Sequence, residues 1–236
     1  MKRVLRLEPP FFEIGPKNYL FGDQILDLAR IADEAAARYN VRVIYTTPYA
    51  DISRVATSVN NIYVFAPHMD DIPVGRGLAC VLPESVRAAG AVGVMLNHAE
   101  RPLTISVLNK TLCRARELSL MSIVCADSMP ETRAVAQLSP DLMITEPTEL
   151  IGTGKACDMS YVKQSFDAVM DINPNIGVLV GGGISNGQDV YNTIMAGADA
   201  TGSSSGIVKA SDPEKMVYEM LQALRNAWDE RTGGKS

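Results

Sequence analysis

The sequence predicts an α/β fold, a single (β/α)8 barrel built from 236 residues. Three observations support this prediction. Short apolar runs alternate with helical patterns along the chain, which is typical of a parallel sheet. Eight such units occur, and no linker or composition break divides them. The mean hydropathy of +0.05 fits a fully buried sheet. An open, doubly wound sheet is the alternative, but eight units without a second domain favour the barrel.

The eight expected strands are short apolar runs bounded by turn residues. Pro48, Pro67 and Pro147 follow the second, third and sixth runs, and proline cannot continue a sheet ladder. The eighth run is polar and rich in small residues. In chain order the strands cover residues 4–7, 41–46, 62–66, 92–96, 121–126, 142–145, 176–180 and 198–203. In a barrel their carboxyl ends meet on one face, which is where the chemistry is expected.

The helical patterns carry recognisable start and stop signals. Gly22 precedes a stripe of apolar residues at helical spacing. Pro83 lies in a first turn and Gly90 follows the last turn of the same helix, while Asp158 or Ser160 can cap another. The expected helices cover residues 22–39, 52–59, 83–89, 104–118, 130–138, 160–170, 188–195 and 212–229. A single domain spanning residues 1–236, with a polar tail from about 230, follows from this order.

Composition excludes several classes of partner. The net charge of −5 argues against nonspecific nucleic-acid binding. No stretch of about 20 apolar residues occurs, and the N-terminus lacks the apolar core of a signal peptide, so no membrane association is expected. The four cysteines, Cys80, Cys113, Cys125 and Cys157, have neither zinc nor redox spacing. We expect reduced thiols in a cytoplasmic protein.

The end of the sixth strand carries the first candidate catalytic residue. Glu146 follows the apolar run, and a short loop then leads to Gly152 and Gly154. A carboxylate at a strand end beside a glycine-tipped lid suits a general base that works in a closed, dry site. The plain alternative is a strand, a turn and an exposed glutamate.

Two loops of small residues are predicted to bind an anion. Residues 181–183 are three glycines after the seventh strand, and Ser204 and Ser205 follow the eighth. Their backbone N–H groups can bind a phosphate, which this fold often holds after strands seven and eight. A tight turn is the alternative for the glycines.

Polar residues at other strand ends complete the candidate site. His98 can polarise a carbonyl group as a hydrogen-bond donor, and Lys17 supplies a positive charge for an oxyanion and a phosphate. Asn97 and Glu100 are expected behind them, with Glu100 holding a lysine or an N–H group. The alternatives are a structural histidine and a solvated lysine; His68 is assigned to structure or a subunit contact. No metal or cofactor motif appears, so the sequence favours cofactor-free proton transfer.

Several segments resemble the triosephosphate isomerase family, in particular its short, archaeal-type form. They are Leu-Asn-His-Ala-Glu-Arg at 96–101, Glu-Pro-Thr-Glu-Leu-Ile-Gly-Thr-Gly at 146–154 and Gly-Gly-Gly-Ile-Ser at 181–185. Weaker matches lie at 83–84 and 89–93, and the likeness runs from the first strand to Lys209. The resemblance implies a TIM barrel and the interconversion of glyceraldehyde 3-phosphate and dihydroxyacetone phosphate without a cofactor.

The resemblance also implies roles for the candidate residues. Glu146 corresponds to the base that moves a proton between C1 and C2 through an enediol(ate), His98 to a neutral electrophile and Lys17 to the electrostatic partner. The lid residue whose N–H closes on phosphate corresponds to Gly152. The remaining phosphate donors correspond to Gly183, Ser204 and Ser205. A homodimer or homotetramer is implied, and the long loop 67–82 is consistent with an interface.

Three departures from the family pattern bear on substrate. Gly15 stands where the family has an asparagine that contacts substrate and lysine, with Asn18 as a candidate replacement. Ala99 stands where serine is usual, and the lid continues differently after Gly154. These departures leave two alternatives: an isomerase of a longer phosphorylated ketose such as a tetrulose phosphate, or a non-catalytic paralogue that binds a sugar phosphate.

Overall fold

The computed structural model describes residues 7–233 and contains a closed barrel of eight parallel strands. Each strand pairs with the next in chain order, and β1 closes the barrel against β8. The strands are β1 (Phe11–Ile14), β2 (Arg42–Thr46), β3 (Ile62–Ala66), β4 (Gly93–Leu96), β5 (Met121–Ala126), β6 (Leu142–Thr145), β7 (Gly177–Val180) and β8 (Ala200–Ser203). The predicted fold class is confirmed.

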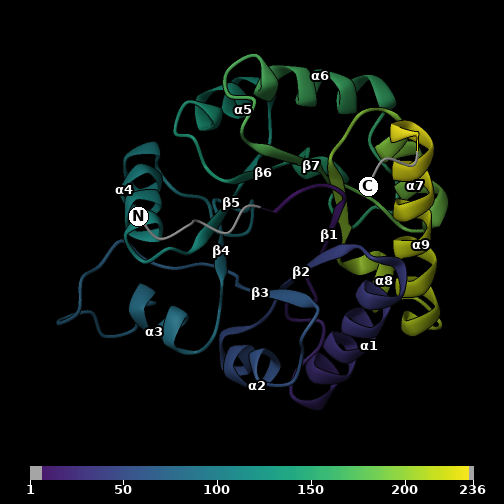
Figure 1. Cartoon of the computed structure of the whole chain (residues 1–236). Helices are drawn as coiled ribbons and strands as arrows, with labels where there is room; N and C mark the ends of the chain where they lie inside the picture. The colour runs from purple at the N-terminus through teal and green to yellow at the C-terminus, as the bar shows by residue number, and fades with distance from the viewer. Residues whose placement is uncertain (1–6, 234–236) are drawn as a thin grey trace.

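Helices surround the barrel, as Figure 1 shows. The α-helices are α1 (Asp23–Tyr39), α2 (Ile52–Ala56), α3 (Pro83–Ala88), α4 (Ile105–Glu117), α5 (Met129–Ala136), α6 (Met159–Met170), α7 (Gly187–Met195), α8 (Ser205–Val208) and α9 (Pro213–Thr232). Two 3-10 turns, η1 (Tyr49–Asp51) and η2 (Thr148–Leu150), lie in loops at the carboxyl ends of β2 and β6. No helix within residues 7–233 is both long and apolar enough to span a membrane.

The first strand is not where the sequence pattern predicted it. The expected strand at 4–7 lies mostly outside the described residues, and Leu7 is not in a strand. The strand that pairs with β2 and β8 is Phe11–Ile14. Both segments are short apolar runs, so only pairing within the closed sheet distinguishes them. Leu7 instead joins the apolar cluster inside the barrel.

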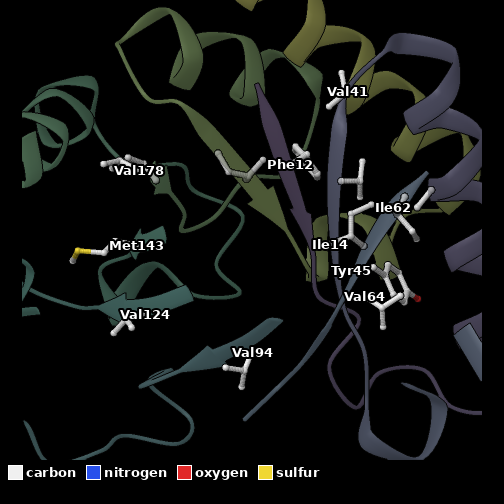
Figure 2. Close-up of a cluster of buried hydrophobic side chains, with 14 of the residues drawn as sticks. Phe12, Ile14, Val41, Tyr45, Ile62, Val64, Val94, Val124, Met143 and Val178 are labelled. Atoms are coloured by element: carbon white, nitrogen blue, oxygen red, sulfur yellow. The ribbon is translucent and has the colours of Figure 1, made fainter. Parts of the chain in front are cut away.

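Two apolar layers hold the barrel together. Inside it, Phe11 and Phe65 are fully buried, and a Cβ atom at Gly93 would approach the Phe65 ring to 2.3 Å. The strands also bury outward-facing side chains against the helices, among them Phe12 and Tyr45 (Figure 2). The Tyr45 hydroxyl donates a hydrogen bond of 2.9 Å to the carbonyl of Ile25 on α1. Because the barrel interior is largely apolar, most polar side chains of the candidate site lie at the carboxyl ends of the strands.

Two further elements differ from expectation. The short helix α8 after β8 was not predicted, since four residues give little periodic signal. The last helix runs to Thr232, so residues 230–232 of the expected polar tail are helical. Arg231 explains the extension, because its guanidinium group donates hydrogen bonds to the carbonyls of Ile194 and Ala198, the latter at 2.8 Å.

Candidate active site

A pocket with a cavity of about 340 Å³ lies at the carboxyl ends of the strands. It is lined by residues at the ends of β1, β2, β3, β4, β6, β7 and β8 or in the loops after them. The predicted site residues that line it are Lys17, His98, Glu100, Glu146, Gly152, Gly183, Ser204 and Ser205. Residues up to 188 positions apart in the chain therefore meet at one cavity, as a (β/α)8 barrel permits.

Lys17 and Glu100 form an ion pair across the pocket mouth. The distance from Lys17 Nζ to Glu100 Oε1 is 2.7 Å. Lys17 has a φ of 50°, a left-handed conformation that is uncommon for residues other than glycine. The hydrogen bond from Lys17 keeps the pKa of Glu100 below its usual value. The expectation that Glu100 holds a lysine therefore agrees with the geometry.

His98 is set up as a neutral hydrogen-bond donor. Its Nδ1 atom accepts a hydrogen bond of 3.1 Å from the N–H group of Glu100. Burial lowers the pKa of His98, and the charge of Lys17 lowers it further, while Glu100 opposes both effects. A neutral ring whose Nδ1 accepts a hydrogen bond carries its proton on Nε2. This nitrogen can therefore donate to an oxygen of a ligand.

Asn97 lies behind the pocket and holds the loop that carries His98. Its side-chain amide donates hydrogen bonds of 2.9 Å to the carbonyl of Cys125 and to the carboxylate of Glu131. Its Oδ1 atom accepts a third, also of 2.9 Å, from the N–H group of Leu103. Asn97 adopts a left-handed conformation with a φ of 57°, which these contacts stabilise.

Glu146 projects from the end of β6 into the pocket, and the chain around it makes room for its side chain. Its backbone N–H group donates to the carbonyl of Ala126, which continues the β5–β6 pairing by one residue. Gly181 and Gly182 pack against it, since Cβ atoms there would lie 3.4 and 3.6 Å from Glu146 Cδ and Cγ. Burial raises the pKa of Glu146, and Lys17 opposes the increase. A carboxylate with a raised pKa is a stronger base once ionised.

The lid and the triple-glycine loop touch each other. Gly152 is in the left-handed conformation, with a φ of 74°. A Cβ atom at Gly183 would meet the carbonyl oxygen of Lys155 at 1.9 Å, so only glycine fits there. The thiol of Cys157 donates a hydrogen bond of 3.0 Å to the carbonyl of Gly181. The C-terminal end of the lid is therefore fixed beside the predicted phosphate loops.

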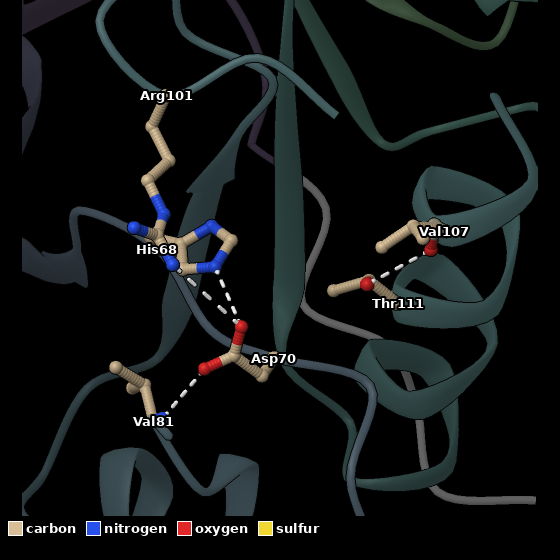
Figure 3. A network of polar contacts seen from close by, with 6 residues as sticks. All are labelled: His68, Asp70, Val81, Arg101, Val107 and Thr111. Carbon is tan, nitrogen blue, oxygen red and sulfur yellow. Dashed lines mark hydrogen bonds and ion pairs between the residues drawn. The ribbon is translucent and has the colours of Figure 1, made fainter. Parts of the chain in front are cut away.

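His68 lies at the wall of the same pocket, which the sequence did not predict. Its ring lies beside Asp70 (Figure 3). The distance from His68 Nε2 to Asp70 Oδ1 is 3.2 Å. The other oxygen of Asp70 accepts a hydrogen bond of 2.6 Å from the N–H group of Val81, which ties the ends of the loop 67–82 together. Arg101 lies 3.9 Å from Asp70 Oδ1. These contacts fit the structural role expected for His68.

Sequence reasoning missed Glu13, a charged residue in the middle of β1. It lines the pocket and is 8% exposed. Burial raises its pKa to about 7, and the charge of Glu146 adds to the increase. A single acidic residue inside the apolar run Phe-Phe-Glu-Ile was the available signal. The misplaced first strand concealed this signal, because it left residues 11–14 in a loop.

Comparisons with known proteins agree with this geometry. A sequence model of the family described as triosephosphate isomerase matches residues 17–220. The triosephosphate isomerase of Saccharolobus solfataricus is 35% identical over 224 residues, which cover 93% of this chain and 98% of the relative. That of Methanosarcina mazei is 35% identical over 220 residues, with coverages of 91% and 99%.

Solved structures extend the likeness to the fold. The crystal structure of triosephosphate isomerase from Bartonella henselae has a TM-score of 0.75 and is 14% identical. The match covers 92% of this chain and 98% of that one. At this identity the likeness bears on the fold alone, and the membership follows from the sequence relatives. The resemblance drawn from the sequence motifs is confirmed: this chain is an isomerase that belongs to the triosephosphate isomerase family.

Proposed function

We propose that the protein interconverts glyceraldehyde 3-phosphate and dihydroxyacetone phosphate without a cofactor. The observation that carries this proposal is the position of Glu146, at the end of β6 in a pocket that Lys17 and His98 also line. The names of the family and of the relatives support the choice of a triose phosphate as substrate.

In the proposed mechanism the Glu146 carboxylate removes a proton from the carbon next to the carbonyl group of the substrate. The electrons of the broken C–H bond form the carbon–carbon double bond of an enediolate, whose negative oxygen is stabilised by Lys17 and by the Nε2–H group of His98. A proton moves between the two oxygens, and Glu146 returns its proton to the neighbouring carbon. No net proton or electron is gained or lost.

The phosphate group is assigned to the loops after β7 and β8. Gly183, Ser204 and Ser205 of these loops line the pocket, and Gly152 lies at the lid tip. Backbone N–H groups there can hold the dianion while the lid excludes water from Glu146. Exclusion of water strengthens the base and protects the enediolate from side reactions.

A coupled isomerase assay with glyceraldehyde 3-phosphate tests this proposal. We expect Glu146→Gln to lower kcat by about 10³-fold or more, because the amide cannot accept the proton. Glu214→Gln is the matched control, since Glu214 is exposed on α9 and should leave kcat unchanged. Near-normal turnover of folded Glu146→Gln would refute the assignment of the base.

A longer phosphorylated ketose, such as a tetrulose phosphate, is the second candidate substrate. The pocket carries a buried carboxyl oxygen of Glu13 without a hydrogen-bond partner among the described residues, and an additional hydroxyl group could satisfy it. Comparison of kcat/KM between triose and tetrulose phosphates decides the question. A clear preference for the triose defeats this candidate, and turnover that depends on Glu146 defeats a purely binding paralogue.

A homo-oligomer is also proposed, from the segment between β3 and α3. This segment projects from the barrel in Figure 1 and exposes Leu78 completely and Val74 to 70%. Exposed apolar residues on a long loop are typical of an interface. Sedimentation of the wild type and of Leu78→Asp should show a smaller species for the variant; a monomeric wild type would contradict the proposal.

A further inference from the structure

Glu13 occupies a position that a barrel normally fills with an apolar side chain. Side chains alternate along β1, so Glu13 shares the inward face with Phe11, which is fully buried in the barrel interior. Burial of a carboxyl group is costly unless it is hydrogen-bonded. A perturbed acid in a cavity is a candidate functional group, and the mechanism above does not use it.

Two glycines make room for this side chain. A Cβ atom at Gly15 would lie 2.9 Å from Glu13 Oε1, so the carboxyl group occupies the space over Gly15. Gly202 pairs with Glu13 across the β1–β8 ladder, and a Cβ atom there would lie 2.7 Å from the backbone carbonyl oxygen of Glu13 and 3.0 Å from its Cβ atom. Neither glycine has a positive φ. Close approach of Glu13 is therefore the constraint that accounts for glycine at both positions.

One oxygen of this carboxyl group lacks a hydrogen-bond partner at the pocket. Glu13 Oε1 is buried and has no partner in good hydrogen-bond geometry among residues 7–233. The hydroxyl of Thr46 on the adjacent strand is close enough to lower the pKa of the carboxyl group, but it also lacks a partner in good geometry. An unsatisfied buried polar atom destabilises the protein, and a ligand oxygen that reaches it removes that cost. The absence of a side chain at Gly15 consequently leaves space that the Glu13 carboxyl group occupies at the wall of the pocket.

We propose that Glu13 is a substrate-binding residue whose carboxyl group, held over Gly15, hydrogen-bonds an oxygen in the sugar part of the bound sugar phosphate. This rests on the proposed function for the class of substrate and adds one residue and one contact to it. Glu13 is assigned to the sugar part because it lines the same pocket as Glu146 and Lys17, which act on the reacting carbons in the mechanism above.

The protonation state of Glu13 follows from its neighbours. Burial raises its pKa to about 7; the Thr46 hydroxyl beside it and the charge of Lys17 lower the pKa, whereas Glu146 from β6 raises it. Cys125 on β5 also faces the carboxyl group, but burial raises the thiol pKa, so it adds no charge. Two close carboxyl groups do not readily ionise together, and Glu146 must be ionised to act as the base. Glu13 therefore keeps its proton and donates it in the hydrogen bond.

Profiles of kcat/KM against pH for the wild type, Glu13→Gln and Glu13→Ala test the proposal. At pH 6 we expect Glu13→Ala to lower kcat/KM about tenfold, since one hydrogen bond is lost. Glu13→Gln should stay within about threefold of the wild type, because its amide also donates. The wild-type activity should fall above pH 7 as Glu13 ionises, and the Gln variant should lack this decrease. Equal losses in both variants, or none in Glu13→Ala, would overturn the proposal.

Gly15→Ala is a second test of the contact between the Glu13 carboxyl group and the substrate. The added methyl group should displace the carboxyl group of Glu13 while leaving its chemical identity intact, since the far end of this side chain can move. We expect a loss of kcat/KM similar to that of Glu13→Ala, and no further loss when the two changes are combined. Losses that multiply would show that the two positions act separately and would contradict the contact. Glu8→Ala, exposed just before β1, is the control.

Binding measurements separate this proposal from the proposed function. Calorimetry should show that Glu13→Ala weakens dihydroxyacetone phosphate about tenfold and leaves inorganic phosphate unaffected, because phosphate lacks the sugar oxygens. This result in a wild type without isomerase activity would refute the function and keep the role of Glu13. Equal weakening of both ligands, or a wild type that binds the triose phosphate no better than phosphate, would overturn the role of Glu13 whatever the turnover.

Discussion

The two sides of the pocket are built in different ways. On the β6–β8 side, the residues are consecutive in loops: Glu146 with its lid, the glycines at 181–183 and the serines at 204–205. On the β1 side, Glu13 fits against Gly202 of β8, and Lys17 pairs with Glu100, 83 positions away. The first side is built from residues adjacent in the chain, whereas the second joins residues that only the fold brings together.

This difference bears on how far the effect of a substitution should spread. Backbone donors and a strand-end base depend on local loop geometry, which a short motif specifies. The ionisable groups around Lys17 depend on one another, because its charge lowers the pKa values of Glu13, Glu100 and Glu146. A change at one of these positions is therefore expected to alter the ionisation of the others.

Removal of Lys17 should produce the largest effect on the β1 side. Lys17→Ala deletes the charge that stabilises the enediolate, and we expect kcat/KM to fall by about 10²- to 10³-fold. Lys163→Ala is the matched control, because Lys163 is exposed on α6 and pairs only with Asp167 at 2.8 Å among the residues that the structure describes. A Lys17→Ala enzyme within about threefold of the wild type would show that the charge of Lys17 takes no part in the reaction.

Replacement of Glu13 should change stability in a way that depends on pH. The unfolded glutamate has a pKa of 4.5, and the folded one a pKa of about 7. Between these values the folded state binds more protons, so stability falls as pH rises. A shift of this size corresponds to about 3 kcal/mol. Denaturation of Glu13→Gln should show that gain over the wild type at pH 9, and none of this pH-dependent gain at pH 4.

Glu8→Gln is the control for this measurement, since Glu8 is exposed and its replacement removes the same kind of side chain outside the pocket. Other carboxyl groups contribute equally to the wild type and to the variant, so the difference isolates Glu13. A difference that stays constant from pH 4 to pH 9 would contradict the raised pKa of the buried carboxyl group. Glu13 would then not be the protonated group that the proposed hydrogen bond to the substrate requires.

The smallest expected effect is on the β6–β8 side. Gly152 has a φ of 74° and no heavy atom within 4 Å of the place where a Cβ atom would stand, so Gly152→Ala adds backbone strain without a clash. We expect about 1 kcal/mol of strain at the lid and a decrease of about fivefold in kcat/KM. Gly197→Ala is the control: it has a φ of 119° and open space after α7, away from the pocket. It should lower the Tm without changing kcat/KM, and equal kinetics in both variants would exclude a role for the lid tip.

The barrel and most of its elements could be predicted from local patterns in the amino-acid sequence. The expected strands at 62–66, 121–126 and 142–145 coincide with β3, β5 and β6. Glu146 and the glycine loop at 181–183 were found for the same reason, since a strand end and the residues after it are adjacent in the chain. Such features can be predicted because they involve residues that are close together in the chain, where the sequence pattern is visible.

The composition of the β1 side, in contrast, depended on how the sheet closes. Two apolar runs competed for the first strand, and closure against β8 selected Phe11–Ile14. That choice turned Glu13 toward the cavity, since side chains alternate along a strand. The pairing of Lys17 with Glu100 and the fit of Glu13 against Gly202 join distant residues. No periodicity in the chain encodes such contacts, because they form only when the barrel brings its first and last strands together.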